Sequence, residues 1–344
     1  MIGLHEPLLD AVRHNCHIAD AQHAADYTLC TYLMKMRELY RWEQGYPLDR
    51  ELDNHQVGEW VRQREAQWES LETQAFRKLP LDDEAMDTFA NEVINTALLP
   101  QGLIYSSGLG KHSAAHFYLA DLLEKKDYNG FTVLISGREW ARDLVSPPAM
   151  TRGNVIYLRR ESLTRLLWER VQEWRWNRCE SPMGRALSFY RLDDDLESGL
   201  AALVDDQLQA VLLHEVGEVR VGTGIESSWQ SLLLSVSGHK AELQLRAIRD
   251  NLADALSTLP ALIDDGRPQL IHFYFATLDP MRKYLSPMLY QAYRKWDHNG
   301  DLQPLKACIE QGQDHWQGLM DAILEPSQPG PAAKISALIE DNLL

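Results

Sequence analysis

Apolar side chains recur every three to four positions over most of the chain, which is the period of an amphipathic helix. Over residues 7–45 they gather on one side of a helical wheel, and a second helical pattern covers 55–79. A third helix is predicted within 80–99, where Asp82 or Asp83 is a natural N-cap. The helical period returns in the second half of the chain, with its longest runs over 161–176, 195–218, 227–263 and 279–296.

The segment between these helical parts has a different pattern. Short runs rich in β-branched and aromatic residues, separated by turn sequences, predict strands over 102–108, 115–126, 131–137 and 154–160. We therefore expect a mainly helical (α+β) protein, with a helical bundle core and a small antiparallel β-meander inserted at about 102–160. Its parts would be residues 1–100, the sheet at 101–160 and residues 161–344, the last packed with 1–100 as one core.

Composition narrows the class of protein. The formal net charge of −16 argues against nucleic-acid binding, which needs lysine and arginine against phosphate. No apolar stretch approaches the roughly 20 residues of a membrane span, and charged residues interrupt the first apolar positions, so neither a membrane helix nor a secretory signal is expected. The four cysteines show no CxxC spacing, which favours free thiols in a reducing cytoplasm.

Three histidines, a cysteine and an aspartate lie within ten residues of the first predicted helix. His17 and His23 each lie three residues from Asp20, so two i, i+3 pairs share one carboxylate. Imidazole nitrogen and carboxylate oxygen at this spacing suit zinc, iron or manganese. Cys16 and Tyr27 fall near this face and would line the cavity, where a phenol or thiol serves redox chemistry or proton transfer. The alternative is a packed polar face whose groups are all hydrogen-bonded.

A second pair lies in a later helix. His214 and Glu218 are four residues apart and project from one face, with Glu215 between them as a candidate general base. This resembles the zincin pattern His-Glu-x-x-His, but Glu218 replaces the second imidazole and favours iron or manganese over zinc. Gly217 either allows another helix to approach closely or marks the helix end. The alternative is a charged helix terminus without a metal.

A third pair is His239 and Glu242. His239 continues an apolar stripe, so we expect it to face the interior, with Glu242 as a ligand or as a group behind the ligands. Helices that each carry a histidine and a carboxylate one turn apart build metal sites in helical bundles, although the di-iron order Glu-x-x-His is absent here. The predicted ligands, which would have to meet in space, are His17, Asp20, His23, His214, Glu218, His239 and Glu242.

Arginines are concentrated in one segment of this acidic chain. Residues 138–191 contain eleven arginines, no lysine and six acidic residues. Arg138, Arg142 and Arg159 are the candidate contacts for an anionic ligand or cofactor, because guanidinium groups bind carboxylate and phosphate bidentately. The alternative is compensation by the acidic residues that follow at 193–197.

Three segments carry a resemblance to a known family. Residues 16–45, 57–72 and 136–150 are similar to a family of bacterial proteins of unknown function, and the similarity extends over most of the chain. The resemblance implies no activity, fold or cofactor.

The residues themselves therefore carry the functional hypotheses. The first is a cytoplasmic metal-dependent enzyme that acts on a small molecule, with an oxidase- or oxygenase-like iron or manganese centre built from the histidine and carboxylate pairs. The second is a zinc-dependent hydrolase in which Glu215 activates water. The third is a non-catalytic protein whose arginine- and tryptophan-rich surface binds an anionic ligand or an acidic partner.

Overall fold

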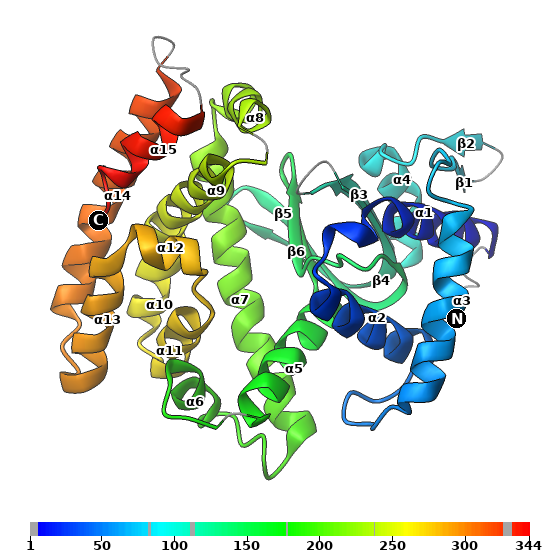
Figure 1. The fold of residues 1–344 in the computed structure, drawn as a ribbon, viewed down its shortest axis with the longest axis horizontal. Coiled ribbons are helices and arrows are strands. Elements are labelled where there is room, and N and C mark those ends of the chain that lie inside the picture. The colour runs from blue at the N-terminus through cyan, green and yellow to red at the C-terminus, as the bar shows by residue number, and fades with distance from the viewer. Residues whose placement is uncertain (1–5, 82–83, 111–113, 177, 237, 326–331) are drawn as a thin grey trace. The chain divides into compact units, whose positions relative to one another are not determined.

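The computed structural model describes residues 6–81, 84–110, 114–176, 178–236, 238–325 and 332–344. It divides into two compact units, Met1–Glu169 and Arg170–Leu344. Helices make up most of the described residues, and the strands described all belong to the first unit (Figure 1). The predicted mainly helical (α+β) class is therefore confirmed. None of the described helices is long and apolar enough to cross a membrane.

The helices of the first unit begin with a break that the sequence pattern did not predict. The helix expected over 7–45 is two helices, α1 (Glu6–His23) and α2 (Leu29–Glu43), separated by the 3₁₀ turn Ala24–Asp26. Thr28 caps α2, since its hydroxyl accepts a hydrogen bond from the backbone N–H of Thr31. The other helices of this unit are α3 (Asn54–Glu69), α4 (Asn91–Leu98) and the first part of α5 (Arg160–Trp176).

The prediction of a helix within 80–99 is wrong for the first half of that range. A two-stranded hairpin occupies that place, formed by β1 (Leu79–Leu81) and β2 (Glu84–Met86). In β1 the two leucines are buried and the proline between them is half-buried, which is a strand period. The proposed caps Asp82 and Asp83 lie outside the described residues.

The predicted strands form one five-stranded sheet, and its order is β3-β4-β5-β7-β6. The first three strands make the expected antiparallel meander, whereas β7 pairs with β5 in parallel. The parallel pairing arises because β6 forms an antiparallel edge hairpin with β7, and this short excursion brings β7 back along β5. The strands are β3 (Leu103–Leu109), β4 (Ala115–Tyr128), β5 (Phe131–Arg142), β6 (Ala149–Arg152) and β7 (Val155–Arg159).

The N-terminal helices share their core with this sheet. Helix α1 packs across β4 and β5, and α4 packs on β3 (Figure 1). One buried cluster joins Leu8, Val12 and Cys16 of α1 to Phe117 and Leu119 of β4. Residues 1–100 and the sheet at 101–160 thus lie in one compact unit. The packing of 1–100 on the C-terminal helices stays a prediction.

The elements described in the second unit are all helices. The helix predicted over 227–263 is interrupted at Gly238, whose φ of +78° suits glycine, so that α8 and α9 are separate. The elements are α6 (Pro182–Leu187), α7 (Leu196–Gly222), α8 (Glu226–Ser235), α9 (Lys240–Ala253), the π-helical turn η4 (Asp254–Thr258), α10 (Leu259–Asp265), α11 (Pro268–Thr277), α12 (Pro280–Leu285), α13 (Pro287–Asn299), α14 (Gln303–Leu324) and α15 (Ala332–Glu340).

Helices α7 and α9 pack against each other (Figure 1), and they are in close contact at Gly217. A Cβ atom at this position would lie 2.4 Å from the carbonyl oxygen of Ala253, the last residue of α9. Of the two interpretations of Gly217, close approach by another helix is therefore the right one. The backbone widens into the π-helical turn η4 directly after this contact, and such turns are frequent at functional sites.

We expect Gly217→Ala to destabilise the protein, because its methyl group meets backbone rather than a side chain that can rotate away. Overpacking of this kind costs about 1–3 kcal/mol, although alanine in a helix interior is intrinsically favoured over glycine by about 1 kcal/mol. The matched control is Gly318→Ala on α14, where an added Cβ meets nothing within 4 Å. Urea unfolding of the two variants measures the difference. Equal stability of both variants would show that the close contact is not restrictive.

Candidate functional site

Three possible metal ligands converge in the C-terminal unit. Helix α7 carries His214 and Glu218 one turn apart, and α9 carries Asp250. One ligand atom from each lies within 4.8 Å of the other two, and all three residues are partly buried. Within the described ranges, this is the one group of three or more histidine, cysteine or acidic side chains that meets this condition. Two of its members, His214 and Glu218, belong to the ligand set predicted from the sequence.

A buried carboxylate orients the imidazole of this cluster. The Nδ1–H of His214 donates a hydrogen bond of 2.7 Å to Asp254, whose side chain is only 2% exposed. The Thr258 hydroxyl donates to the same carboxylate oxygen at 2.6 Å, and Arg282 forms an ion pair with the other oxygen. The opposite ring nitrogen, Nε2, lies 3.3 Å from Glu218. A carboxylate behind a histidine in this way is the usual arrangement behind metal-bound imidazoles.

Charges inside the cluster shift its pKa values strongly. Burial alone would raise the pKa of Asp254, but the positive charges of Arg282 and His214 lower it below its ordinary value. Burial would lower the pKa of His214, but Asp254 and Glu218 raise it well above its ordinary value. For Asp250, burial raises the pKa above its ordinary value; the positive charges of Arg282 and His214 act against this shift, and the neighbouring carboxylates add to it. The cluster therefore concentrates negative charge around one imidazole, which favours either a protonated ring or a cation bound in place of that proton.

The distances between the ligand atoms and the exposure of their side chains also fit a metal site. Ligand atoms bonded to one ion at about 2.1 Å lie roughly 3–4 Å apart, which is compatible with this cluster. The His214 and Glu218 side chains are 27% and 34% exposed, so solvent reaches the place where an ion would bind. Three protein ligands from two helices leave coordination positions for water or substrate.

The first predicted constellation has a different environment in the N-terminal unit. His17 Nδ1 accepts hydrogen bonds from Arg64 at 3.1 Å and from Trp68 at 3.5 Å, and burial with the Arg64 charge lowers its pKa to about 3. Asp20 is buried and accepts a hydrogen bond from the backbone N–H of Leu144 at 2.8 Å. These contacts match the alternative of a packed polar face.

The other two residues predicted for this constellation, His23 and Tyr27, each have different surroundings. His23 pairs with Asp26 at 3.2 Å, at the end of α1. Tyr27 lies beyond the helix break, and burial together with the Asp20 carboxylate raises its pKa to about 12. The predicted meeting of His17 or His23 with the histidines of the second unit stays a prediction.

The third pair does not contribute to the cluster. The expectation that His239 faces the interior is wrong, because the turn at Gly238 ends the apolar stripe and leaves His239 exposed as the N-cap of α9. Glu242 is buried, but its carboxylate accepts hydrogen bonds from the Gly238 N–H and from Arg246 and thereby stabilises the start of α9. Glu215 lies beside His214 on α7 and is not one of the three converging residues.

Sequence reasoning missed the α9 side of the cluster. Asp250 and Asp254 are four residues apart in a helix whose neighbouring positions Ile248 and Leu252 are fully buried. Two acidic residues one turn apart next to buried apolar positions are a recognisable signal of a buried polar site. Arg282, which comes from α12, could not be placed beside them without the fold.

A second candidate site is a cavity of about 680 Å³ in the N-terminal unit. It brings together predicted residues from both ends of this unit: Cys16, His17 and Asp20 from α1, and Arg138 and Arg142 from β5. The other lining residues are Arg13, Leu39, Trp42, Glu43, Gln44, Gly45, Tyr46, Glu139, Trp140, Glu161 and Arg165.

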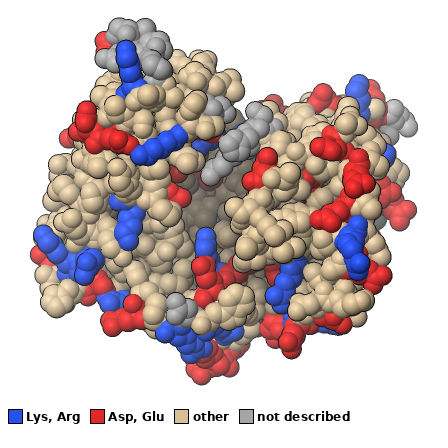
Figure 2. Space-filling view, in the orientation of Figure 1, with Lys and Arg blue, Asp and Glu red and all other residues tan. Residues whose placement is uncertain are grey.

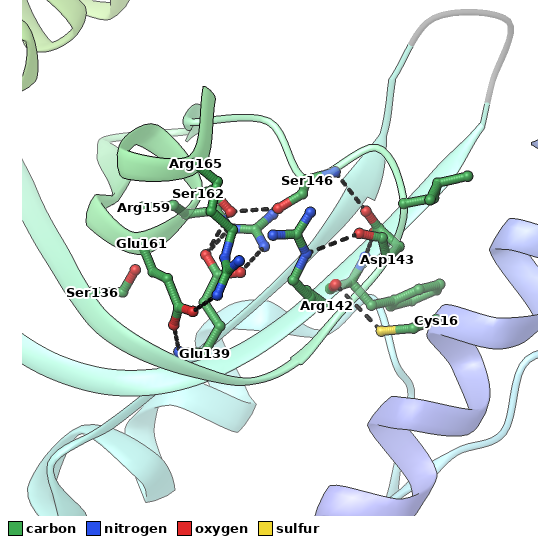
Figure 3. A network of polar contacts seen from close by, with 12 residues as sticks. Cys16, Ser136, Glu139, Arg142, Asp143, Ser146, Arg159, Glu161, Ser162 and Arg165 are labelled. Atoms are coloured by element: carbon green, nitrogen blue, oxygen red, sulfur yellow. Dashed lines mark hydrogen bonds and ion pairs between the residues drawn. The ribbon is translucent and has the colours of Figure 1, made fainter. Parts of the chain in front are cut away.

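One lining residue, Glu139, belongs to a buried ion pair with Arg159 (Figure 3). Arg159 donates two hydrogen bonds, of 2.8 and 2.9 Å, to Glu139, and both side chains are completely buried. The Ser162 hydroxyl donates to the same carboxylate at 2.7 Å, and Glu161 accepts a hydrogen bond from the backbone N–H of Glu139. Arg159 was predicted to contact a ligand directly, but it does not line the cavity. Its role here is to neutralise the charge of Glu139.

The later arginines of the basic segment are mostly paired with acids. Ion pairs join Arg170 to Glu173, Arg178 to Asp193 and Arg191 to Asp194. On the face shown in Figure 2, basic and acidic side chains are interspersed rather than gathered in one patch. The compensation alternative therefore describes these arginines, whereas Arg138 and Arg142 line the cavity.

Comparison with protein families gives a similar division of the chain. The model of the N-terminal domain of a family of unknown function (DUF6866) matches residues 7–159, and the model of its C-terminal domain matches residues 164–343. The chain belongs to the DUF6866 family. The resemblance to a family of unknown function is thus confirmed. No curated protein and no solved structure matches the chain, so the function of this DUF6866 member must be inferred from its own residues.

In this DUF6866 chain we expect Arg159→Leu to lower the free energy of unfolding by about 3–5 kcal/mol, because Glu139 is left buried and unpaired. Adding Glu139→Gln removes the isolated charge, so the double variant should recover part of the loss. Urea unfolding followed by tryptophan fluorescence measures both. A double variant less stable than Arg159→Leu alone would contradict the assignment of the loss to the unpaired carboxylate.

Proposed function

We propose that the protein is a metal-dependent enzyme that binds one first-row transition metal ion through His214, Glu218 and Asp250. The observation that carries this proposal is the convergence of the three ligand atoms within 4.8 Å. The hydrogen bond from His214 to Asp254 supports it, because it fixes the tautomer that leaves Nε2 as the ligand atom.

The donor set favours iron or manganese over zinc. One imidazole nitrogen and two carboxylates form an oxygen-rich site, whereas zinc sites more often contain several nitrogen or sulfur ligands. The charges balance as well. Glu218 and Asp250 offset a divalent ion, and Arg282 offsets Asp254 behind the imidazole.

A site with three protein ligands leaves coordination positions open for water or substrate. We therefore interpret it as a catalytic site rather than a structural one. A bound ion would supply Lewis acidity and, as iron, oxidative chemistry of the oxidase or oxygenase type. The zinc hydrolase alternative has less support, because one imidazole and two carboxylates form a set richer in oxygen than zinc sites usually have. The proposal includes a small-molecule substrate and a cytoplasmic location, since all four cysteines are free.

Metal binding tests the proposal directly. Protein stripped with a chelator and reloaded without oxygen should take up about one equivalent of Fe(II) or Mn(II), measured by elemental analysis after desalting. His214→Ala, Glu218→Gln and Asp250→Asn should each abolish this uptake. Asp254→Asn should weaken affinity about 10–100-fold, as do changes behind the ligands in other metal sites.

His298→Ala and Asp314→Asn, two exposed residues of the same unit, are the matched controls and should bind like the wild type. Uptake below about a tenth of an equivalent would contradict the proposal, because built sites retain their metal far better. So would uptake that all three ligand variants preserve. Optical spectra of the iron-loaded protein before and after oxygen then test the oxidative branch, and an unchanged spectrum would count against it.

A further inference from the structure

The cavity of the N-terminal unit has an excess of positive charge. Its lining glutamates already have partners: Glu43 pairs with Arg64, Glu139 pairs with Arg159, and Glu161 pairs with Arg165. The remaining acid, Asp20, is fully buried, and burial raises its pKa well above the ordinary value. In contrast, three lining arginines form no ion pair with any acid in the described part of the chain, namely Arg13, Arg138 and Arg142.

Two arginines present donors that nothing in the described structure accepts. Nη1 of Arg142 and both Nε and Nη1 of Arg165 are buried without a hydrogen-bond partner. These side chains come from β5 and α5, and both line the same cavity (Figure 3). Because unmatched buried donors are rare in folded proteins, they point to an acceptor that is absent here.

The lining of the cavity also contains aromatic side chains that are suited to an organic body. Trp42 and Trp140 line it, and the guanidinium groups of Arg142 and Arg138 lie 5.7 and 4.0 Å from the centres of their rings. Stacked guanidinium and indole groups form flat surfaces that bind planar groups. The volume of about 680 Å³ lies in the range of small-molecule sites.

We propose that this cavity binds a small organic anion whose phosphate or carboxylate group accepts hydrogen bonds from Arg142 and Arg165 while its body packs on Trp42 and Trp140. Guanidinium forks match the oxygens of both groups, so the shared chemistry is an oxyanion on an organic molecule. This site is independent of the metal centre, since each is built from residues of a different unit.

Titration with two probes tests the proposal and distinguishes binding of a phosphate group from binding of a carboxylate group. AMP carries a phosphate on a planar base, and citrate carries carboxylates alone. We expect calorimetry and tryptophan fluorescence to detect AMP, citrate or both at concentrations up to 10 mM. Arg142→Gln and Arg165→Gln should weaken that binding at least tenfold, and Arg142→Lys should retain part of it, because it keeps the charge but loses the fork.

Arg62→Gln, an exposed arginine of α3 outside the cavity, is the matched control and should bind like the wild type. Circular dichroism identifies any variant that fails to fold. Absence of binding by both probes at 10 mM would overturn the proposal, and so would binding that the Arg142 and Arg165 variants retain as fully as Arg62→Gln. Metal-free protein should give the same result, so failure here is distinct from failure of the metal proposal.

Discussion

The contact between Gly217 and the carbonyl group of Ala253 is the constraint on which the candidate metal centre depends. It allows α7 and α9 to approach at the level of the cluster, since Gly217 lies between His214 and Glu218 on α7, and Ala253 lies between Asp250 and Asp254. A side chain at this position would separate the two helices. The ligand set therefore rests on the absence of a side chain in the middle of a helix.

The same electrostatic principle organises both units. In each, an arginine neutralises a buried carboxylate: Arg282 pairs with Asp254, and Arg159 pairs with Glu139. Such pairs are stable only when both partners remain, because either charge alone is poorly solvated. In the C-terminal unit the paired carboxylate orients His214. In the N-terminal unit the pair neutralises Glu139 and so leaves the cavity arginines in excess.

The sequence predicted what is local and missed what depends on tertiary packing. Strands and long helices follow from side-chain periodicity, and His214 with Glu218 was recognisable because a helix places them one turn apart. The α1–α2 break was hidden, since Ala24–Asp26 are compatible with a helix. The convergence of Asp250 with His214 and Glu218, like the parallel pairing of β5 with β7, depends on segments that meet only in the fold.

The central claim is that one metal ion is held between α7 and α9, and anomalous diffraction from crystals soaked in Mn(II) tests it most directly. The account predicts one anomalous peak about 2.0–2.3 Å from His214 Nε2 and from an oxygen of Glu218 and of Asp250. The His214–Asp254 hydrogen bond should remain intact. A map without a peak there, in which His214 instead bridges Asp254 and Glu218 by hydrogen bonds, would contradict it.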